Sequence, residues 1–272
     1  MYTYPVVLSI AGSDSGGGAG IQADLKTMSA LGCFGTTAIT AITVQNTMGV
    51  TGIHPVPVDF VIGQIRAVMN DLKPSAIKIG MVHSAEVVHG IAETLQLYPK
   101  VPVILDPVML TSSGDRLIQE QTVEAFKAEL FPLATLITPN LDETSVLTGK
   151  KVGNVEEMKE AAQQLLKYGS RAVLIKGGHL DLEVLSDVYL HRDDDFLIFN
   201  SWKIETRNTH GTGCTLSSAI ASYVALGNDL SVAIEKSERY IELAIEHGRD
   251  VKTGEGHGPI NHFCKPEKLV KR

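Results

Sequence analysis

Cysteine is scarce in this chain, and the few cysteines lie far apart. Three of the 272 residues are cysteines, at positions 33, 214 and 264. A set this small and scattered excludes a disulfide framework, and it lacks the spacing of a zinc site. The sequence is therefore typical of a protein that stays reduced, and we expect it in the cytoplasm.

Long apolar runs and clusters of basic residues are missing as well. No apolar run reaches the roughly 20 residues that span a bilayer, and residues 1–5 lack the basic-then-apolar pattern of a signal peptide. The formal net charge is −7, and no cluster of lysine and arginine could follow the phosphates of a nucleic acid. We expect no membrane partner and no nucleic-acid partner, and instead a small-molecule substrate.

What the chain does contain is an alternation of short apolar runs and amphipathic stretches. This alternation predicts the α/β class, with a mainly parallel sheet wrapped by helices. The runs are rich in leucine and β-branched residues, as expected of strands covered on both faces. We predict strands at 6–11, 37–44, 76–79, 101–105, 136–138 and 172–175. No linker or repeat interrupts the pattern, so residues 1–272 are expected to form a single domain.

Helices are predicted between and after these strands, from apolar residues at helical spacing and from N-terminal capping signals. They are expected around 21–31 and 61–72, and then at 154–169, 215–226 and 230–247. Residues 187–204 break the alternation and predict a β-hairpin just before the first of the two closing helices. Because ligands of open α/β sheets bind outside the carboxyl ends of the strands, functional residues are expected there.

The segment 208–219 carries the most chemical information. Gly211 and Gly213 flank Thr212, and an apolar run at helical spacing follows. Such a turn can point several free N–H groups at one spot, where the positive end of the helix dipole also attracts anions. Cys214 lies inside this predicted anion hole, where we expect a lowered thiol pKa, although cysteine is also a common buried small residue. An anion hole beside a reactive group indicates group transfer, of phosphate in the first place.

The first predicted strand is followed by a second glycine-rich loop. Residues 12–20 include five glycines, more than one turn needs, which favours a loop that contacts a ligand. A dinucleotide fingerprint would require an acidic residue about 20 positions further on to hold the ribose. None stands between Asp24 and Asp59, so that interpretation fails, and no Gly-Lys-Ser/Thr follows to make a P-loop.

Two carboxylates and a lysine follow other predicted strands. Asp106 and Glu143 come just after strand ends and could hold Mg²⁺, partly through water. Alternatively, Asn140 or Asp142 caps a short helix and Glu143 lies in its first turn, and both interpretations can hold together. Lys176 closes a further strand and could reach phosphate oxygens, although a lysine at a strand end is commonplace.

Other candidates are weaker. Gln45 follows the second strand, where its amide could read a flat heterocycle or lie in an ordinary polar loop. His210 could be a base, but a neutral histidine that hydrogen-bonds the loop is favoured, since a helix N-terminus disfavours imidazolium. Residues 256–259 either fold over the site or form a tail.

Taken together, these motifs resemble the hydroxymethylpyrimidine/phosphomethylpyrimidine kinases of thiamine biosynthesis, which belong to the ribokinase-like superfamily. The resemblance covers essentially the whole chain. Its markers stand at 12–14, 16–24, 44–47, 78–81, 106–109, 137–140, 176–179, 208–215 and 256–259. It implies a ribokinase-like three-layer α/β/α fold, with ATP along the carboxyl edge of the sheet and the pyrimidine in an adjoining pocket.

The resemblance also implies roles for single residues. The pyrimidine pocket would be lined by Gly12, Ala19, Gln45, Met81 and Val108, with Gln45 paired to the aminopyrimidine. ATP and its phosphates would meet Asn140, Lys176 and the loop 211–213, and Glu143 would serve Mg²⁺. Cys214 would take the hydroxyl proton, at a position where many ribokinase-like enzymes have aspartate. Asp187 also falls where the family shows an aspartate, with no role assigned.

The activity implied is phosphorylation of the pyrimidine alcohol to its monophosphate and then to the diphosphate. A pyridoxine/pyridoxal kinase is the nearest alternative, alone or as a second activity, and Gln45 is the residue that should discriminate. A sugar or nucleoside kinase is disfavoured by the cysteine at 214. A non-catalytic binding module would bind these ligands without turnover. We also expect a homo-oligomer, a dimer in the simplest case.

Overall fold

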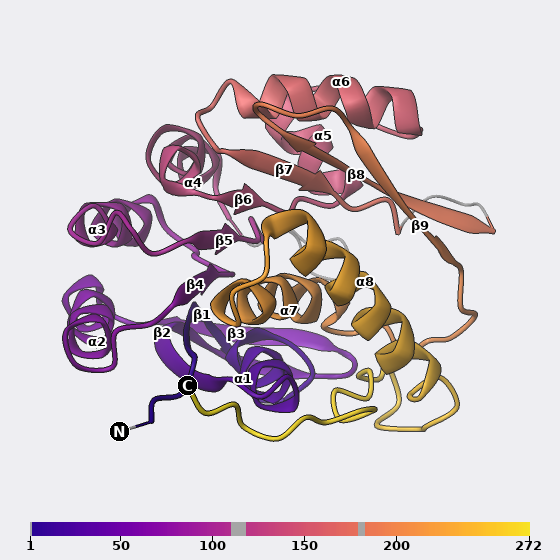
Figure 1. Cartoon of the computed structure of the whole chain (residues 1–272), viewed down its shortest axis with the longest axis horizontal. Coiled ribbons are helices and arrows are strands. Elements are labelled where there is room, and N and C mark those ends of the chain that lie inside the picture. Colours follow the sequence, from indigo (N-terminus) through magenta and orange to yellow (C-terminus); the bar gives the residue numbers. More distant parts are fainter. Residues whose placement is uncertain (1, 110–117, 179–182) are drawn as a thin grey trace.

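The computed structural model describes residues 2–109, 118–178 and 183–272, and in this part of the chain nine strands form one sheet (Figure 1). The sheet order is β3-β2-β1-β4-β5-β6-β7-β8-β9, and all pairs from β2 to β7 are parallel. The strands are β1 (Val6–Asp14), β2 (Phe34–Asn46), β3 (Gly49–Pro55), β4 (Ala76–Ile79), β5 (Val103–Leu105), β6 (Leu136–Ile137), β7 (Ala172–Ile175), β8 (Val184–His191) and β9 (Leu197–Trp202). The predicted mainly parallel sheet is confirmed.

Helices cover both faces of this sheet and complete a three-layer α/β/α architecture. One layer holds α1, α7 and α8, and the other holds α2 to α6 (Figure 1). The helices are α1 (Gly20–Ala30), α2 (Val58–Asp71), α3 (Ala85–Leu95), α4 (Glu120–Ala125), α5 (Leu141–Thr148), α6 (Val155–Leu166), α7 (Thr212–Ala225) and α8 (Leu230–Glu246). No helix within the described residues is both long enough and apolar enough to cross a bilayer.

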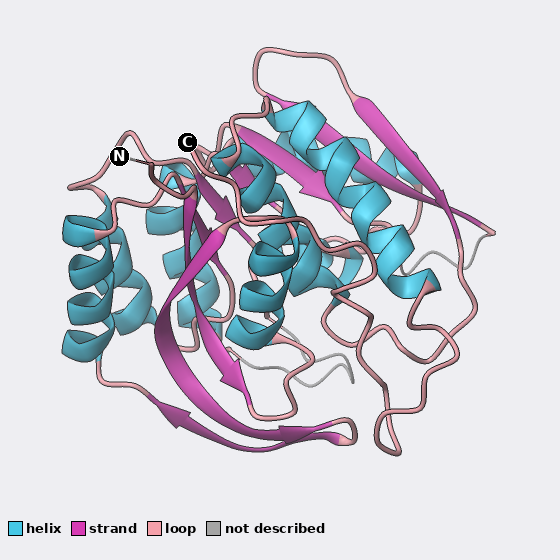
Figure 2. Ribbon diagram, turned by 60° about the horizontal axis from the view of Figure 1, so that its bottom comes forward, coloured by secondary structure: helices cyan, strands magenta, loops and turns pink. Residues whose placement is uncertain are grey.

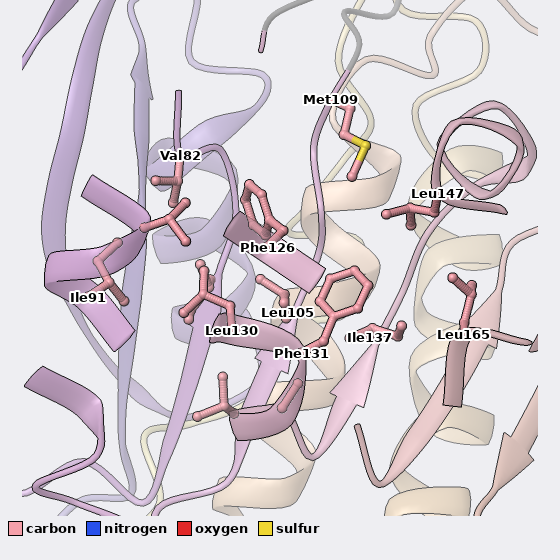
Figure 3. Close-up of a cluster of buried hydrophobic side chains, with 14 of the residues drawn as sticks. Val82, Ile91, Leu105, Met109, Phe126, Leu130, Phe131, Ile137, Leu147 and Leu165 are labelled. Carbon is pink, nitrogen blue, oxygen red and sulfur yellow. The ribbon is translucent and has the colours of Figure 1, made fainter. Parts of the chain in front are cut away.

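The larger apolar core lies between the sheet and the layer of α2 to α6. Figure 3 shows part of it, where Phe126 and Phe131 lie beside Leu105 and Ile137 of the sheet, and all four side chains are fully buried. A second core packs α7 and α8 on the opposite face of the sheet. Strands with an apolar cover on both sides explain why the sequence shows continuous apolar runs.

The structure adds elements that the apolar pattern did not predict. β3 pairs antiparallel with β2, and the two form a long curved ribbon at one end of the sheet (Figure 2). β3 has the sequence Gly-Val-Thr-Gly-Ile-His-Pro, and most of it is exposed, so it lacks the apolar run of a buried strand. The predicted hairpin at 187–204 is confirmed as the antiparallel pair β8 and β9.

Candidate active site

The predicted anion hole is the first turn of α7. This helix begins at Thr212, three residues before the predicted start, and Gly211 precedes it in the left-handed conformation with φ of +86°. A Cβ at Gly211 would overlap with the carbonyl oxygen of Gly18. Glycine is therefore required at 211 for two reasons, because other residues disfavour this φ and because the two glycine-rich loops touch there.

Cys214 lies in this turn, but the expected lowering of its thiol pKa is wrong. Burial raises the pKa of Cys214 to about 11 although the nearby ammonium of Lys78 acts in the opposite direction. The carboxylates of Asp24 and Asp106 raise it further, and the N–H of Gly20, which donates to the sulfur, lowers it. Desolvation of the thiolate thus outweighs the attraction of the helix N-terminus.

Lys176 and Asp106 meet beside the anion hole. The ammonium of Lys176 lies 2.7 Å from Asp106 Oδ1, and Thr138 Oγ1 donates to the same oxygen at 3.1 Å. A Cβ built at Gly213 would be 3.3 Å from the Lys176 nitrogen, so the loop and the lysine are neighbours. Burial alone would lower the pKa of Lys176, but Asp106 and Glu143 raise it above its ordinary value. A fixed positive charge thus stands beside the backbone donors of α7.

The helix-capping interpretation is confirmed, because Asn140 caps α5 and Glu143 lies in the first turn of this helix. The Asn140 side chain accepts from Glu143 N at 2.9 Å, and Glu143 Oε2 accepts from Asn140 N at 2.8 Å, which is a capping box at the start of α5. Burial raises the pKa of Glu143 to about 7, with Lys176 opposing and Asp106 adding to the effect. A divalent cation would relieve this cost, so the donor set fits Mg²⁺ that keeps most of its water.

The carboxylate of Asp106, predicted as a metal ligand, already has partners in the structure. One of its oxygens already accepts from Lys176 and Thr138, and the other lies 3.4 Å from Ser217 Oγ. Among the described residues no group of three or more histidine, cysteine, aspartate or glutamate side chains could hold a metal ion by itself. A cation here would need phosphate oxygens and water as its other ligands.

The residues predicted to line the pyrimidine pocket lie around the same end of the sheet. A Cβ at Gly12 would be 3.2 Å from Met81 Sδ, so these two are in contact across β1 and β4. Ala19 precedes α1, and Gln45 stands near the end of β2, where its amide lies 3.0 Å from Thr43 Oγ1. Val108 follows Asp106 within the loop after β5.

Asp14 is a residue of this site that the sequence analysis missed. Its carboxylate accepts from the backbone of Gly16 at 2.7 Å and of Ala19 at 2.8 Å, and His210 Nε2 lies 3.0 Å away. Burial would raise the pKa of Asp14, but the hydrogen bond from His210 and those from the backbone lower it below its ordinary value. The Asp-Ser-Gly-Gly run is a common turn signal that could have indicated this role.

These contacts explain part of the glycine content of the first glycine-rich loop, residues 12–20. A Cβ at Gly18 would collide with the His210 ring, so part of the glycine content serves close packing of two protein loops. His210 hydrogen-bonds the loop through Asp14, as the favoured interpretation of this histidine expected. Residues 256–259 pack against the His210 loop and the turn after β2, since His210 N donates to Gly258 O at 3.1 Å and His257 N donates to Thr47 O at 3.0 Å. They border the site and do not form a free tail.

Residues 14–261 match the family model described as phosphomethylpyrimidine kinase. The chain belongs to this family. It is similar to the hydroxymethylpyrimidine/phosphomethylpyrimidine kinase of Rhizobium meliloti, with 47% identity over 260 residues, which cover 95% of this chain and 97% of that protein. It is also 47% identical over 271 residues to a bifunctional protein of thiamine biosynthesis from Geobacter sulfurreducens, covering 98% of this chain and 54% of that longer protein.

The fold is shared with a solved structure from the same superfamily. An ADP complex of Bacillus subtilis pyridoxal kinase matches with a TM-score of 0.88 and 33% identity, covering 96% of this chain and 98% of that one. Family membership and fold confirm the expected ribokinase-like kinase architecture. The marker at residue 179 lies outside the described residues.

Proposed function

We propose that this kinase transfers the γ-phosphoryl group of ATP to the hydroxymethyl group of 4-amino-5-hydroxymethyl-2-methylpyrimidine and then to the resulting monophosphate. The observation that carries this proposal is that the α7 N-terminus and Lys176 lie at the same end of the sheet as Gln45 and Met81. The similarity to the hydroxymethylpyrimidine/phosphomethylpyrimidine kinase of Rhizobium meliloti supports the same substrate class.

The phosphate side of the reaction rests on fixed positive charge. The backbone N–H groups of residues 211–214 and the ammonium of Lys176 would stabilise the charge on the transferring phosphoryl group. Of these backbone groups, Thr212 N already donates to Thr209 O at 3.2 Å. Asp106 Oδ1 accepts from the ammonium of Lys176 at 2.7 Å and holds it in place. Mg²⁺ would be held through Glu143, with Asp106 as a second ligand if its ion pair opens, and it would neutralise the triphosphate. Asn140 would contact the nucleotide from the start of α5.

Recognition of the pyrimidine would depend on the shape of the pocket and on the side-chain amide of Gln45. Gly12, Ala19, Met81 and Val108 would enclose the ring, and the carboxamide of Gln45 would pair with the aminopyrimidine edge. Cys214 would accept the hydroxyl proton during attack on the γ-phosphorus. Because its thiol pKa is about 11, little thiolate is present at neutral pH before substrates bind. The thiol can therefore act as the base only if its pKa falls toward the working pH during the reaction.

Turnover with separate alcohols tests this function. ADP release is measured with Mg-ATP and, one at a time, hydroxymethylpyrimidine, its monophosphate, pyridoxal and ribose. We expect turnover of both pyrimidines, whereas turnover of pyridoxal alone would overturn the assignment. A Gln45→Leu variant should raise KM for the pyrimidine and leave KM for ATP unchanged. Binding without any turnover would instead indicate a non-catalytic module.

Pyridoxal kinase is the second candidate, as the main or an additional activity. The similarity to the pyridoxal kinase of Bacillus subtilis favours it, since the fold match extends over nearly the whole chain. A pyridine ring lacks the paired amino edge, so Gln45→Leu should affect pyridoxal turnover less than pyrimidine turnover.

We further propose that the chain forms a homodimer through the β2–β3 ribbon. Ile42 and Val44 are 51% and 64% exposed, and they project from the same face of β2, while Met48 in the turn is 71% exposed. Contiguous exposed apolar side chains of this kind mark association surfaces. Light scattering should give twice the monomer mass for the wild type and the monomer mass for Val44→Lys, and a wild-type monomer would contradict the proposal.

A further inference from the structure

The chain after α8 packs back against the layer of α1, α7 and α8. Residues 261–272 run to the start of β1, where Arg272 N donates to Thr3 O at 2.9 Å and Thr3 N donates to Arg272 O at 2.8 Å (Figure 1). On the way, Glu267 N donates to Ala30 O at 2.7 Å, at the end of α1. This segment has no helix or strand of its own, but its backbone is held at defined places.

One side chain of this segment reaches the start of α7. His262 Nε2 lies 3.1 Å from Thr215 Oγ1, and the two residues are 4% and 0% exposed, so they form a buried hydrogen bond. Thr215 follows Cys214 directly and belongs to the first turn of α7. Thr215 N donates to Gly211 O at 2.9 Å, which closes the turn of the predicted anion hole. The hydrogen bond therefore ties residues 261–272 to that turn.

His262 is itself fixed from a second helix. The hydroxyl of Tyr240 on α8 donates to His262 O at 2.6 Å. The Tyr240 side chain packs with Ala30, Leu31 and Ala219 in a small buried cluster, which joins α1, α7 and α8. The first turn of α7 is thus held, through His262, against a closely packed part of the molecule.

Packing alone does not require polar groups at these two positions. Valine has the shape of threonine and leucine nearly the volume of histidine, so an apolar pair could fill the same space. Burial lowers the pKa of His262 to about 4, and the charge of Lys26 acts in the same direction, so the imidazole is neutral near pH 7. A satisfied buried hydrogen bond is directional and specifies one arrangement of its partners. The pair therefore determines where the turn lies.

We propose that His262 and Thr215 are positioning residues for phosphoryl transfer: their hydrogen bond sets the place of the first turn of α7 and of the backbone N–H groups in it. The proposal rests on the proposed function. In both phosphorylations a substrate oxygen forms a bond to the γ-phosphorus while the bond from this phosphorus to the ADP oxygen breaks. In the first, the hydroxyl proton also leaves, to the thiolate form of Cys214.

Both phosphorylations depend on the same N–H groups, so loss of this hydrogen bond should slow both by a similar factor. A shift of about 1 Å in a positioned group can cost roughly 100-fold in rate. Because the turn stays attached to α7, we expect a smaller displacement and a decrease in kcat of about tenfold. Groups that bind the pyrimidine and the nucleotide elsewhere keep their places, so both KM values should change little.

Four variants test this role in an assay of ADP release. Thr215→Val keeps the shape of the side chain and removes the hydroxyl, and His262→Leu removes the imidazole. Both should lower kcat about tenfold with hydroxymethylpyrimidine and with its monophosphate, and change KM by less than about twofold. Thr215→Ser keeps the hydroxyl, and the amide of His262→Gln can replace Nε2 as donor or acceptor. These two should recover most of the wild-type kcat.

Hydrogen–deuterium exchange measures the turn without any turnover. Peptides that cover residues 211–216 should exchange about fivefold to tenfold faster in Thr215→Val, the factor that corresponds to loss of one buried hydrogen bond. Ser222→Ala is the matched control, because Ser222 is a fully buried residue of the same helix whose hydroxyl donates to Ser218 O at 2.7 Å. This control should keep the wild-type kcat and the wild-type exchange at 211–216.

The outcomes separate this inference from the proposed function. A folded Thr215→Val variant with the wild-type kcat would overturn the positioning role, and so would a decrease confined to the first phosphorylation. An equal loss of kcat in Ser222→Ala, or no recovery in Thr215→Ser, would also overturn it. If exchange at 211–216 increases as expected but the wild type turns over neither pyrimidine, the proposed function fails while the effect of the pair on the turn stands.

Discussion

Substitution of Gly211 by alanine is the sharpest perturbation that the structure offers. A residue other than glycine pays about 1 kcal/mol for the left-handed conformation, which Gly211 adopts with φ of +86°. The new Cβ would also overlap with the carbonyl oxygen of Gly18. Since Cβ contacts under 3.0 Å essentially never occur, the two glycine-rich loops must separate by about 1 Å.

This displacement should affect catalysis far more than stability. A shift of about 1 Å in a positioned group can cost roughly 100-fold in rate, and loss of one backbone donor to a developing charge costs about 100-fold to 1,000-fold. We therefore expect kcat of Gly211→Ala to fall by roughly 100-fold or more in an assay of ADP release. Its melting temperature should fall by only a few degrees for each kcal/mol lost.

Gly149→Ala provides a matched control. Gly149 follows α5 in the same left-handed conformation, with φ of +71°, and a Cβ there would have no neighbour within 4 Å. This variant should lose about 1 kcal/mol of stability through backbone strain alone and keep the wild-type kcat. If Gly211→Ala also keeps the wild-type kcat while it unfolds like Gly149→Ala, the α7 turn does not stabilise the transferring phosphoryl group.

Two further predictions concern the thiol and the buried glutamate. Cys214→Ala should slow the first phosphorylation far more than the second, because the second nucleophile is already a phosphate; equal losses in both rates would contradict this. Burial raises the pKa of Glu143 from 4.5 to about 7, so between these pH values Glu143 holds a proton in the folded state and loses it in the unfolded state. The contribution of Glu143 to the free energy of unfolding therefore decreases as the pH rises from 4.5 through 7. Urea unfolding at pH 5 and pH 7 without Mg²⁺ should show a smaller decrease for Glu143→Gln, and an unchanged pH dependence would argue against the raised pKa.

Much of the fold and of the candidate site could be predicted from local sequence. Strands such as β4 and β7 are short, fully buried and apolar apart from Lys78, so their composition alone indicates them. The glycine-rich turn at the start of α7 was predictable because Gly211 and Gly213 stand directly before an apolar helical run. Lys176 and Glu143 follow strand ends, and the topology of a parallel sheet brings such positions to one edge.

Other features depend on residues far apart in the sequence, and they arise only when the chain is folded. Asp14 and His210 pair across 196 positions, and Lys78 and Asp24 across 54, so no local pattern reveals either contact. The thiol of Cys214 shows the physical reason most directly. Its sequence neighbours, at a helix N-terminus, predict a lowered pKa, but burial by other parts of the chain raises that pKa to about 11. The residue types and their order specify which groups could perform the chemistry, whereas the protonation state of this thiol depends on how far packing excludes solvent from it.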